Sequence, residues 1–267
     1  MPTIEMSDGV RLYYEDFGEG APLVFVHGGA ATHGLWEQQV YTLADSFRTI
    51  TYDHRGVGGS DKPRDGYTVD RLADDLHELV QRLGLEDVTL VSHGFGGHVV
   101  LRCLHRHPDV AARVALCSAA PWYVGEKSGA GGFSESFFAG LNEGIARNNP
   151  QANWDLAEHW LFHKDPGEPM KLACLQMALS WPVYVWKLLA RDLPDADHRE
   201  YLGLITQPTL VLHGEHDRKN RYEGAAYLAE HLPGARLVTF ADSAHCPFFE
   251  ELEKFNKVLT EFVRTAQ

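Results

Sequence analysis

The sequence alternates short apolar runs with stretches of helical periodicity, and this alternation limits the possible fold more than any other feature. Each apolar run has the length of a buried strand. Strands and helices repeated in this order predict an α/β fold, in which a mostly parallel sheet is covered on both faces by helices. The predicted strands are LVFVH (23–27), RTITYD (48–53), DVTLVSH (87–93), ARVALCSA (112–119), PTLVLHGEHD (208–217) and ARLVTFADSAH (235–245).

The clearest helix is predicted between Thr68 and Gly84. Thr68 is suited to cap its amino end and Gly84 to stop it. Apolar residues recur there at the spacing of one helical face: Val69, Leu72, Ala73, Leu76, Val80 and Leu83. Further helices are predicted over about 33–46, 95–107, 222–232 and the C-terminal stretch with Leu252, Phe255, Leu259, Phe262 and Val263 on one face.

The alternation stops between about residues 120 and 200, where five of the six tryptophans lie in a helical pattern. We predict a helical cap of residues 120–200, inserted into a core formed by residues 1–119 and 201–267. Open parallel sheets place their sites at the carboxyl ends of the strands, so the cap is expected to cover that edge. Its aromatic side chains would either pack the cap itself or contact a substrate.

Composition excludes several classes of protein. The net charge of −13 gives no reason to expect nucleic acid or an anionic membrane as partner. No run approaches the roughly 18 apolar residues of a membrane helix, and the N-terminus does not resemble a signal peptide, so a cytoplasmic chain is expected. The four cysteines lie far apart without a CxxC pair, which argues against a zinc ribbon or thioredoxin motif. We therefore expect a monomer or homodimer that acts on a small-molecule substrate.

A strand-to-helix junction carries the most informative motif. Ser92-His93-Gly94-Phe95-Gly96-Gly97 follows a predicted buried strand and precedes a helix. The spacing is that of a nucleophile elbow, a sharp turn that lifts one side chain above the sheet. Gly94 occupies the nucleophile position, and a glycine has no hydroxyl with which to form an acyl-enzyme.

Five motifs together make the chain resemble the α/β-hydrolase superfamily, close to its cap-bearing esterase, lactonase and proline-iminopeptidase-like branch. They stand in the order and spacing of that superfamily and cover nearly the whole chain: VFVHGG (24–29), YDHRGVGGSDKP (52–63), VSHGFGGHVVL (91–101), LHGEHD (212–217) and SAHCPFFE (243–250).

The resemblance implies a role for particular residues. Asp217 would orient His245, which would act as the general base. The oxyanion hole would use backbone N–H groups of Gly29 (or Ala30) and Phe95. The implied reaction is hydrolysis of a carboxylic ester, lactone or possibly amide through a serine at position 94, with an apolar or aromatic substrate group and no cofactor.

Several residues allow a second interpretation. Glu215 could replace Asp217, although strand alternation favours Asp217. His213, Glu215 and His216 lack the spacing of a metal site. Ser92 is expected to point into packing and Cys246 to face away from His245. Trp36 and Trp122 are candidates for substrate contact.

A peptidase would use cap carboxylates to hold an amino terminus, and four are available: Glu135, Glu143, Glu158 and Glu168.

Gly94 leaves three hypotheses open. The chain is an inactive variant of a serine hydrolase, or it is a natural glycine protein in which His245 and Asp217 act as a base on water or on a substrate proton, or it binds a ligand without catalysis. The intact oxyanion loop, acid and base favour the first hypothesis.

Overall fold

The computed structural model describes residues 2–125 and 132–265, and these confirm the predicted α/β fold. The strands form one sheet in the order β1-β2-β4-β3-β5-β6-β7-β8. Neighbouring strands from β4 to β8 in this order run parallel. They are β3 (Pro22–Val26), β4 (Arg48–Tyr52), β5 (Thr89–His93), β6 (Arg113–Cys117), β7 (Thr209–Gly214) and β8 (Arg236–Phe240).

The remaining two strands were not predicted. β1 (Thr3–Glu5) and β2 (Arg11–Phe17) are antiparallel to each other, and β2 is antiparallel to β4 at one edge of the sheet. They extend the sheet on the side away from the predicted catalytic residues, which follow β5, β7 and β8.

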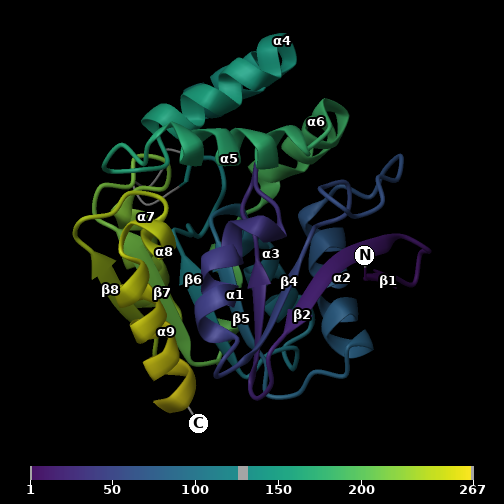
Figure 1. Ribbon diagram of the computed structural model, residues 1–267, viewed down its shortest axis with the longest axis vertical. Coiled ribbons are helices and arrows are strands. Elements are labelled where there is room, and N and C mark those ends of the chain that lie inside the picture. Colours follow the sequence, from purple (N-terminus) through teal and green to yellow (C-terminus); the bar gives the residue numbers. More distant parts are fainter. Residues whose placement is uncertain (1, 126–131, 266–267) are drawn as a thin grey trace.

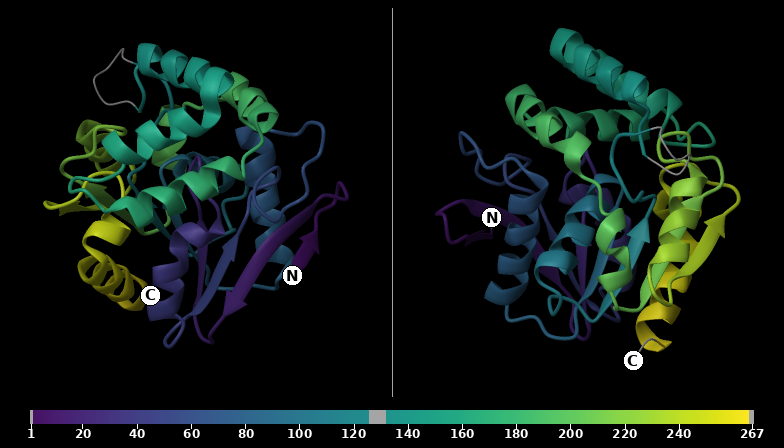
Figure 2. Two further views of the ribbon diagram at one scale, coloured as in Figure 1. Left: turned by 45° about the horizontal axis from the view of Figure 1, so that its top comes forward. Right: turned by 180° about the vertical axis from the view of Figure 1, so that it is seen from behind.

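Helices cover both faces of the sheet. Side chains alternate along each strand, and apolar residues therefore project from both faces and must be covered. Val24 and Leu90 face one hydrophobic cluster, whereas Leu23 and Val91 face the other. The first cluster is covered by α2 (Val69–Arg82), α3 (Phe95–Arg106) and α7 (Tyr222–His231), and the second by η1 (His33–Trp36), α1 (Glu37–Leu43), α8 (Pro247–Glu250) and α9 (Leu252–Thr265) (Figure 2). The Thr68 hydroxyl accepts a hydrogen bond of 3.1 Å from the backbone N–H of Arg71, as expected of the cap of α2.

The predicted helical insertion lies between β6 and β7. Its long helix has a kink at Asn148, two residues before Pro150. Figure 1 shows the three long helices of this segment together beyond one end of the sheet. The insertion contains α4 (Glu135–His159), α5 (Glu168–Leu179), α6 (Val183–Asp192), η2 (Leu193–Asp195) and η3 (Arg199–Leu204).

In the part of the chain that the structure describes, no single helix is long and apolar enough to cross a membrane. The bent pair 168–179 and 183–195, with 78° between its halves, meets the same criteria of length and composition when taken together.

Candidate active site

Gly94 forms the sharp turn that the elbow motif predicts. It links the end of β5 to the start of α3 with φ +51° and ψ −114°, a backbone conformation that favours glycine. The first turn of α3 also packs very close to the end of β3, since a Cβ on Gly96 would lie only 2.5 Å from the carbonyl oxygen of Val26. Small residues are therefore required beside the turn as well as at it.

Asp217 and His245 are paired in the structure. The Nδ1–H of His245 donates to Oδ2 of Asp217 over 2.8 Å, and both side chains are buried. The other carboxylate oxygen of Asp217 accepts hydrogen bonds from the backbone N–H groups of Lys219 and Asn220. Each residue follows the carboxyl end of its own strand, β7 or β8, and the parallel sheet brings these ends together.

Burial sets the charge state of this pair. It raises the pKa of Asp217 to about 6, although His213 and the two backbone N–H groups act in the opposite direction. Burial also lowers the pKa of His245 well below its ordinary value, and the positive charge of Lys219 lowers it further. The imidazole is thus kept neutral, which is the form in which Nε2 can accept a proton.

The second nitrogen of His245 faces Gly94. Nε2 is buried and has no hydrogen-bond partner among the described residues. A Cβ placed on Gly94 would lie 3.1 Å from this nitrogen. The structure thus brings together the three residues predicted from the elbow and the two strand ends, and a side chain at position 94 would meet His245 directly.

Gly29 and Phe95, the predicted oxyanion donors, also lie next to each other. A Cβ on Gly29 would be 3.6 Å from Cβ of Phe95. Phe95 is the first residue of α3, where backbone N–H groups have no acceptor within the helix. Ala30 has a positive φ of 57°, which marks the sharp turn of the loop after β3. Their proximity is compatible with a shared oxyanion site.

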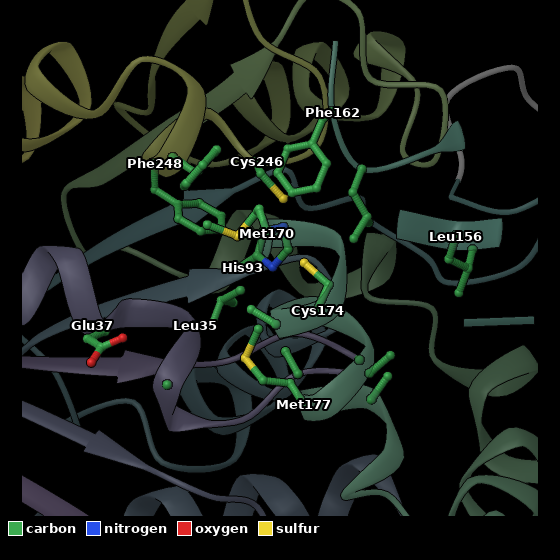
Figure 3. Close-up of a pocket in the computed structure, with 18 of the residues that line it drawn as sticks. Leu35, Glu37, His93, Leu156, Phe162, Met170, Cys174, Met177, Cys246 and Phe248 are labelled. Carbon is green, nitrogen blue, oxygen red and sulfur yellow. The ribbon is translucent and has the colours of Figure 1, made fainter. Parts of the chain in front are cut away.

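A cavity of about 140 Å³ lies between the core and the insertion. Figure 3 shows Met170 and Cys174 of α5 beside His93 and Cys246 of the core. A smaller space of about 20 Å³ adjoins it and shares Gly29 with its wall. Most side chains around the larger cavity are apolar, and those labelled in Figure 3 include Leu35, Leu156, Phe162, Met170, Met177 and Phe248.

His245 lies next to the wall of the larger cavity, since its ring centroid is 4.5 Å from that of His93. His93 and Cys246 line this cavity, while their sequence neighbours Gly94 and His245 do not. The prediction that Cys246 faces away from His245 stays a prediction, and Cys246 is placed by the start of a helix. Strand alternation no longer applies there, because β8 ends at Phe240 and Cys246 caps the short helix α8.

The two tryptophans predicted to contact substrate do not line either cavity. Trp36, the last residue of η1, is fully buried against Phe25 and Phe248. The indole N–H of Trp122 donates to the carbonyl of Gly125. The tryptophans at the smaller cavity are Trp181 and Trp186, which the helical pattern of the insertion did not distinguish from packing residues.

Lys219 is the functional candidate that sequence reasoning missed. It lines both cavities and follows Asp217 by two residues. Its position in the turn that follows Asp217 could have identified it from the sequence, because this turn must lie at the same edge of the sheet as Asp217.

The alternative site residues have other surroundings. Ser92 is fully buried, and its hydroxyl lies 3.4 Å from the carbonyl oxygen of Ala115. Glu215 is exposed, and the carboxylate hydrogen-bonded to His245 is that of Asp217. Over residues 2–125 and 132–265, no group of three histidine, cysteine or acidic side chains is arranged to hold a metal ion.

Comparisons with known proteins agree with the predicted fold. The family model for the α/β-hydrolase fold matches residues 21–160 and 178–252. The chain is 32% identical to the non-heme chloroperoxidase CPO-A1 of Kitasatospora aureofaciens, with 98% of this chain and 99% of that protein covered. It is 29% identical to the bifunctional esterase/perhydrolase DCH of Acinetobacter calcoaceticus, with 99% and 100% covered.

A solved structure is similar over almost its whole length. An esterase from Exiguobacterium antarcticum superposes with a TM-score of 0.94 at 31% identity, and 98% of this chain and 99% of that chain are covered. These similarities point to the haloperoxidase and esterase branch of the predicted superfamily.

Proposed function

We propose that this chain, which belongs to the α/β-hydrolase fold family, is built to act on a carboxylic ester or lactone by serine-type acyl transfer and lacks the serine of that reaction because position 94 is glycine. The chain would bind its substrate between the core and the cap. The similarity to enzymes named as an esterase and an esterase/perhydrolase supports this chemistry.

One observation carries the proposal: a side chain at position 94 would point at an intact acid and base. The Cβ site is 3.1 Å from the unpartnered Nε2 of His245, and Asp217 holds the opposite nitrogen at 2.8 Å. The backbone of Gly94 retains the conformation of an elbow. Only the hydroxyl is missing from this arrangement.

With serine at position 94, the reaction would follow from these positions. The hydroxyl oxygen would attack the ester carbonyl while its proton moves to Nε2 of His245, and Asp217 would stabilise the imidazolium. Backbone N–H groups of Gly29 and Phe95 would hold the oxyanion. The alcohol would leave with the proton from His245, and water would then hydrolyse the acyl group by the same base.

The cavity supports a small apolar substrate group. Its volume of about 140 Å³ is close to that of an apolar protein cavity known to accommodate benzene, about 150 Å³. None of the four cap carboxylates that a peptidase could use lines either cavity. We therefore favour an ester or lactone over a peptide with a free amino terminus.

The substitution Gly94→Ser tests the proposal, with Gly94→Ala as its matched control. Both replacements place a Cβ at a positive φ, which costs about 1–3 kcal/mol of stability. Only serine adds a nucleophile, so hydrolysis of short p-nitrophenyl esters should rise about 10³-fold or more over the alanine variant. A folded Gly94→Ser protein with no more activity than Gly94→Ala would overturn the proposal.

The free nitrogen of His245 favours a second candidate function. Without a side chain at position 94, Nε2 could act as a base on a water molecule or on an acidic substrate proton. The unmodified chain would then convert a substrate, His245→Ala would abolish the reaction, and Gly94→Ser would reduce it by filling the space beside Nε2. Recovery of every tested ester unchanged by the unmodified chain would contradict this second function.

A further inference from the structure

We propose that Lys219 binds a carboxylate carried by the ligand, so that the substrate class narrows to esters or lactones with a free carboxylate group; this inference rests on the proposed function. Nothing in the acyl-transfer reaction described above uses this residue. That reaction does not explain why Lys219 lines both cavities or why its ammonium group has no anionic partner among the described residues.

Lys219 lies where the two cavities meet. It contributes to the wall of both, together with Gly29, Asn153 and Leu156. No other lysine or arginine among the described residues lines either space. A ligand group that enters from the larger cavity toward Gly29 would therefore meet one positive charge.

The ammonium group has no anionic partner in the described part of the chain. The hydrogen bonds and ion pairs of the described residues include none from its Nζ, which lies 5.8 Å from the ring centroid of Phe133. Asp217 is engaged elsewhere, by His245 and by two backbone N–H groups. The Lys219 side chain is partly buried, and this burial lowers its pKa below the ordinary value although the charge of Asp217 acts in the opposite direction.

An ammonium in such surroundings gains from an anion more than a solvated one does. A charge that has lost water is costly unless it is paired and hydrogen-bonded. Hydrogen bonds between ionised groups are about twice as strong as neutral ones. The other charged residue at the larger cavity, Glu37, is exposed and stands apart from the lining cluster in Figure 3, so it does not neutralise Lys219.

The turn that carries Lys219 is fixed by the catalytic acid. Oδ1 of Asp217 accepts the backbone N–H of Lys219 at 2.8 Å, while Oδ2 accepts from His245. The positive charge also lowers the pKa values of His245 and His93. A carboxylate bound to Lys219 would thus be held at a defined position relative to the reacting atoms.

A single ammonium is matched to a monoanion. Phosphate and its esters are usually held by several donors or by arginine forks, and the walls of these cavities present only one cationic side chain. The apolar remainder of the larger cavity would accommodate the hydrocarbon part of the ligand. The same charge would repel the protonated amino terminus of a peptide.

The test compares two ligands of nearly equal shape, phenylacetate and phenylacetamide, by isothermal titration calorimetry on the unmodified chain. The carboxylate should bind about tenfold more tightly than the amide, the effect expected of one charged hydrogen bond. Lys219→Met should remove this preference by weakening phenylacetate about tenfold, and phenylacetamide should change by less than about twofold. Lys219→Arg should keep most of the preference.

Lys257→Met is the matched control, because it removes the same charge from an exposed site on α9. It should leave both affinities unchanged. Thermal unfolding checks that each variant is folded, and Lys219→Gln replaces Lys219→Met if the latter is not. A wild-type chain without preference for phenylacetate overturns the inference, as does a Lys219 variant that weakens both ligands equally or neither.

The outcome is separate from that of the proposed function. Binding requires no nucleophile, so a Gly94→Ser protein that fails to hydrolyse esters would leave the calorimetric result valid. Conversely, a loss of the carboxylate preference would leave the acyl-transfer proposal standing with a neutral substrate.

Discussion

Two buried histidines of this molecule, His245 and His98, differ in what surrounds their ring nitrogens. His245 is hydrogen-bonded to Asp217, and His98 of α3 is hydrogen-bonded at 2.9 Å to His198, whose other nitrogen contacts the hydroxyl of Tyr201. All of these imidazoles are fully buried, and burial lowers the pKa of each.

The two sites differ in whether one ring nitrogen is left without a hydrogen-bond partner. In the pair between α3 and η3, His198 has a side-chain partner on each ring nitrogen. In the other pair, Nε2 of His245 has none in the described part of the chain and points at the elbow. Burial and a lowered pKa alone therefore do not mark a catalytic histidine. The more specific sign is an unpartnered nitrogen whose ring is hydrogen-bonded to a carboxylate through the other nitrogen. The rings with an unpartnered nitrogen at His54, His93 and His213 instead contact backbone carbonyl oxygens through the other nitrogen.

Removal of each histidine in the Gly94→Ser background should give the largest contrast. His245→Ala should lower ester hydrolysis by about 10³-fold or more, because it removes the base. His98→Ala should lower it by less than about fivefold, since His98 touches no predicted reacting atom. The measurement is kcat/KM for a p-nitrophenyl ester. Equal losses in the two variants would erase the distinction between the pairs.

The free energy of unfolding, unlike ester hydrolysis, should depend on His98. His98→Ala should lower the free energy of unfolding by about 1–3 kcal/mol, because it leaves a buried nitrogen of His198 without a partner. His231→Ala, at an exposed histidine of α7, should change it by less than about 0.5 kcal/mol. Urea unfolding at pH 7.5 measures both. A His98 variant as stable as the His231 variant would show that this buried pair contributes nothing.

The pH dependence of the same stability has a defined sign. Burial lowers the pKa of His98 to about 3, whereas an unfolded histidine titrates near 6.5. The unfolded state therefore takes up a proton first as the pH falls. The contribution of neutral His98 to stability is complete above pH 6.5 and is lost as the pH falls from there toward 3. Repeating the urea series at pH 5.5 should narrow the gap between wild type and His98→Ala.

A smaller effect concerns the base itself. The charge of Lys219 lowers the pKa of His245, and His213 acts in the same direction. Hydrolysis by Gly94→Ser needs neutral His245, so activity should fall on the acid side through that pKa. Adding Lys219→Met should move this acid limb to higher pH, which a profile of kcat/KM against pH would detect. A limb that moves to lower pH, or stays in place, contradicts the electrostatic role of Lys219.

Sequence reasoning recovered the parts of the site that depend on strand order. Gly94, Asp217 and His245 each follow a strand of the parallel sheet, so the fold alone brings them to one edge. The cap of α2 by Thr68 was equally predictable, because helix capping is a local interaction. These predictions needed no knowledge of side-chain packing.

Features that depend on tertiary packing were not recovered. The place of Trp36 depends on a loop that leaves the strand pattern, and Lys219 is marked in the sequence only by its position in the turn after Asp217. Which aromatic residues of the insertion reach the cavity depends on how its helices pack, and their spacing in the sequence does not contain that information. Pattern alone thus locates the catalytic edge but not the walls of its pocket.

The most direct test of the central claim is covalent labelling by a fluorophosphonate, which reacts with an activated serine by loss of fluoride. Intact-mass spectrometry should find one phosphonyl group on Gly94→Ser, and none on the unmodified chain, on Gly94→Ala or on Gly94→Ser with His245→Ala. A folded Gly94→Ser protein that remains unlabelled, or labelling that persists without His245, would contradict the claim that this site lacks only its nucleophile.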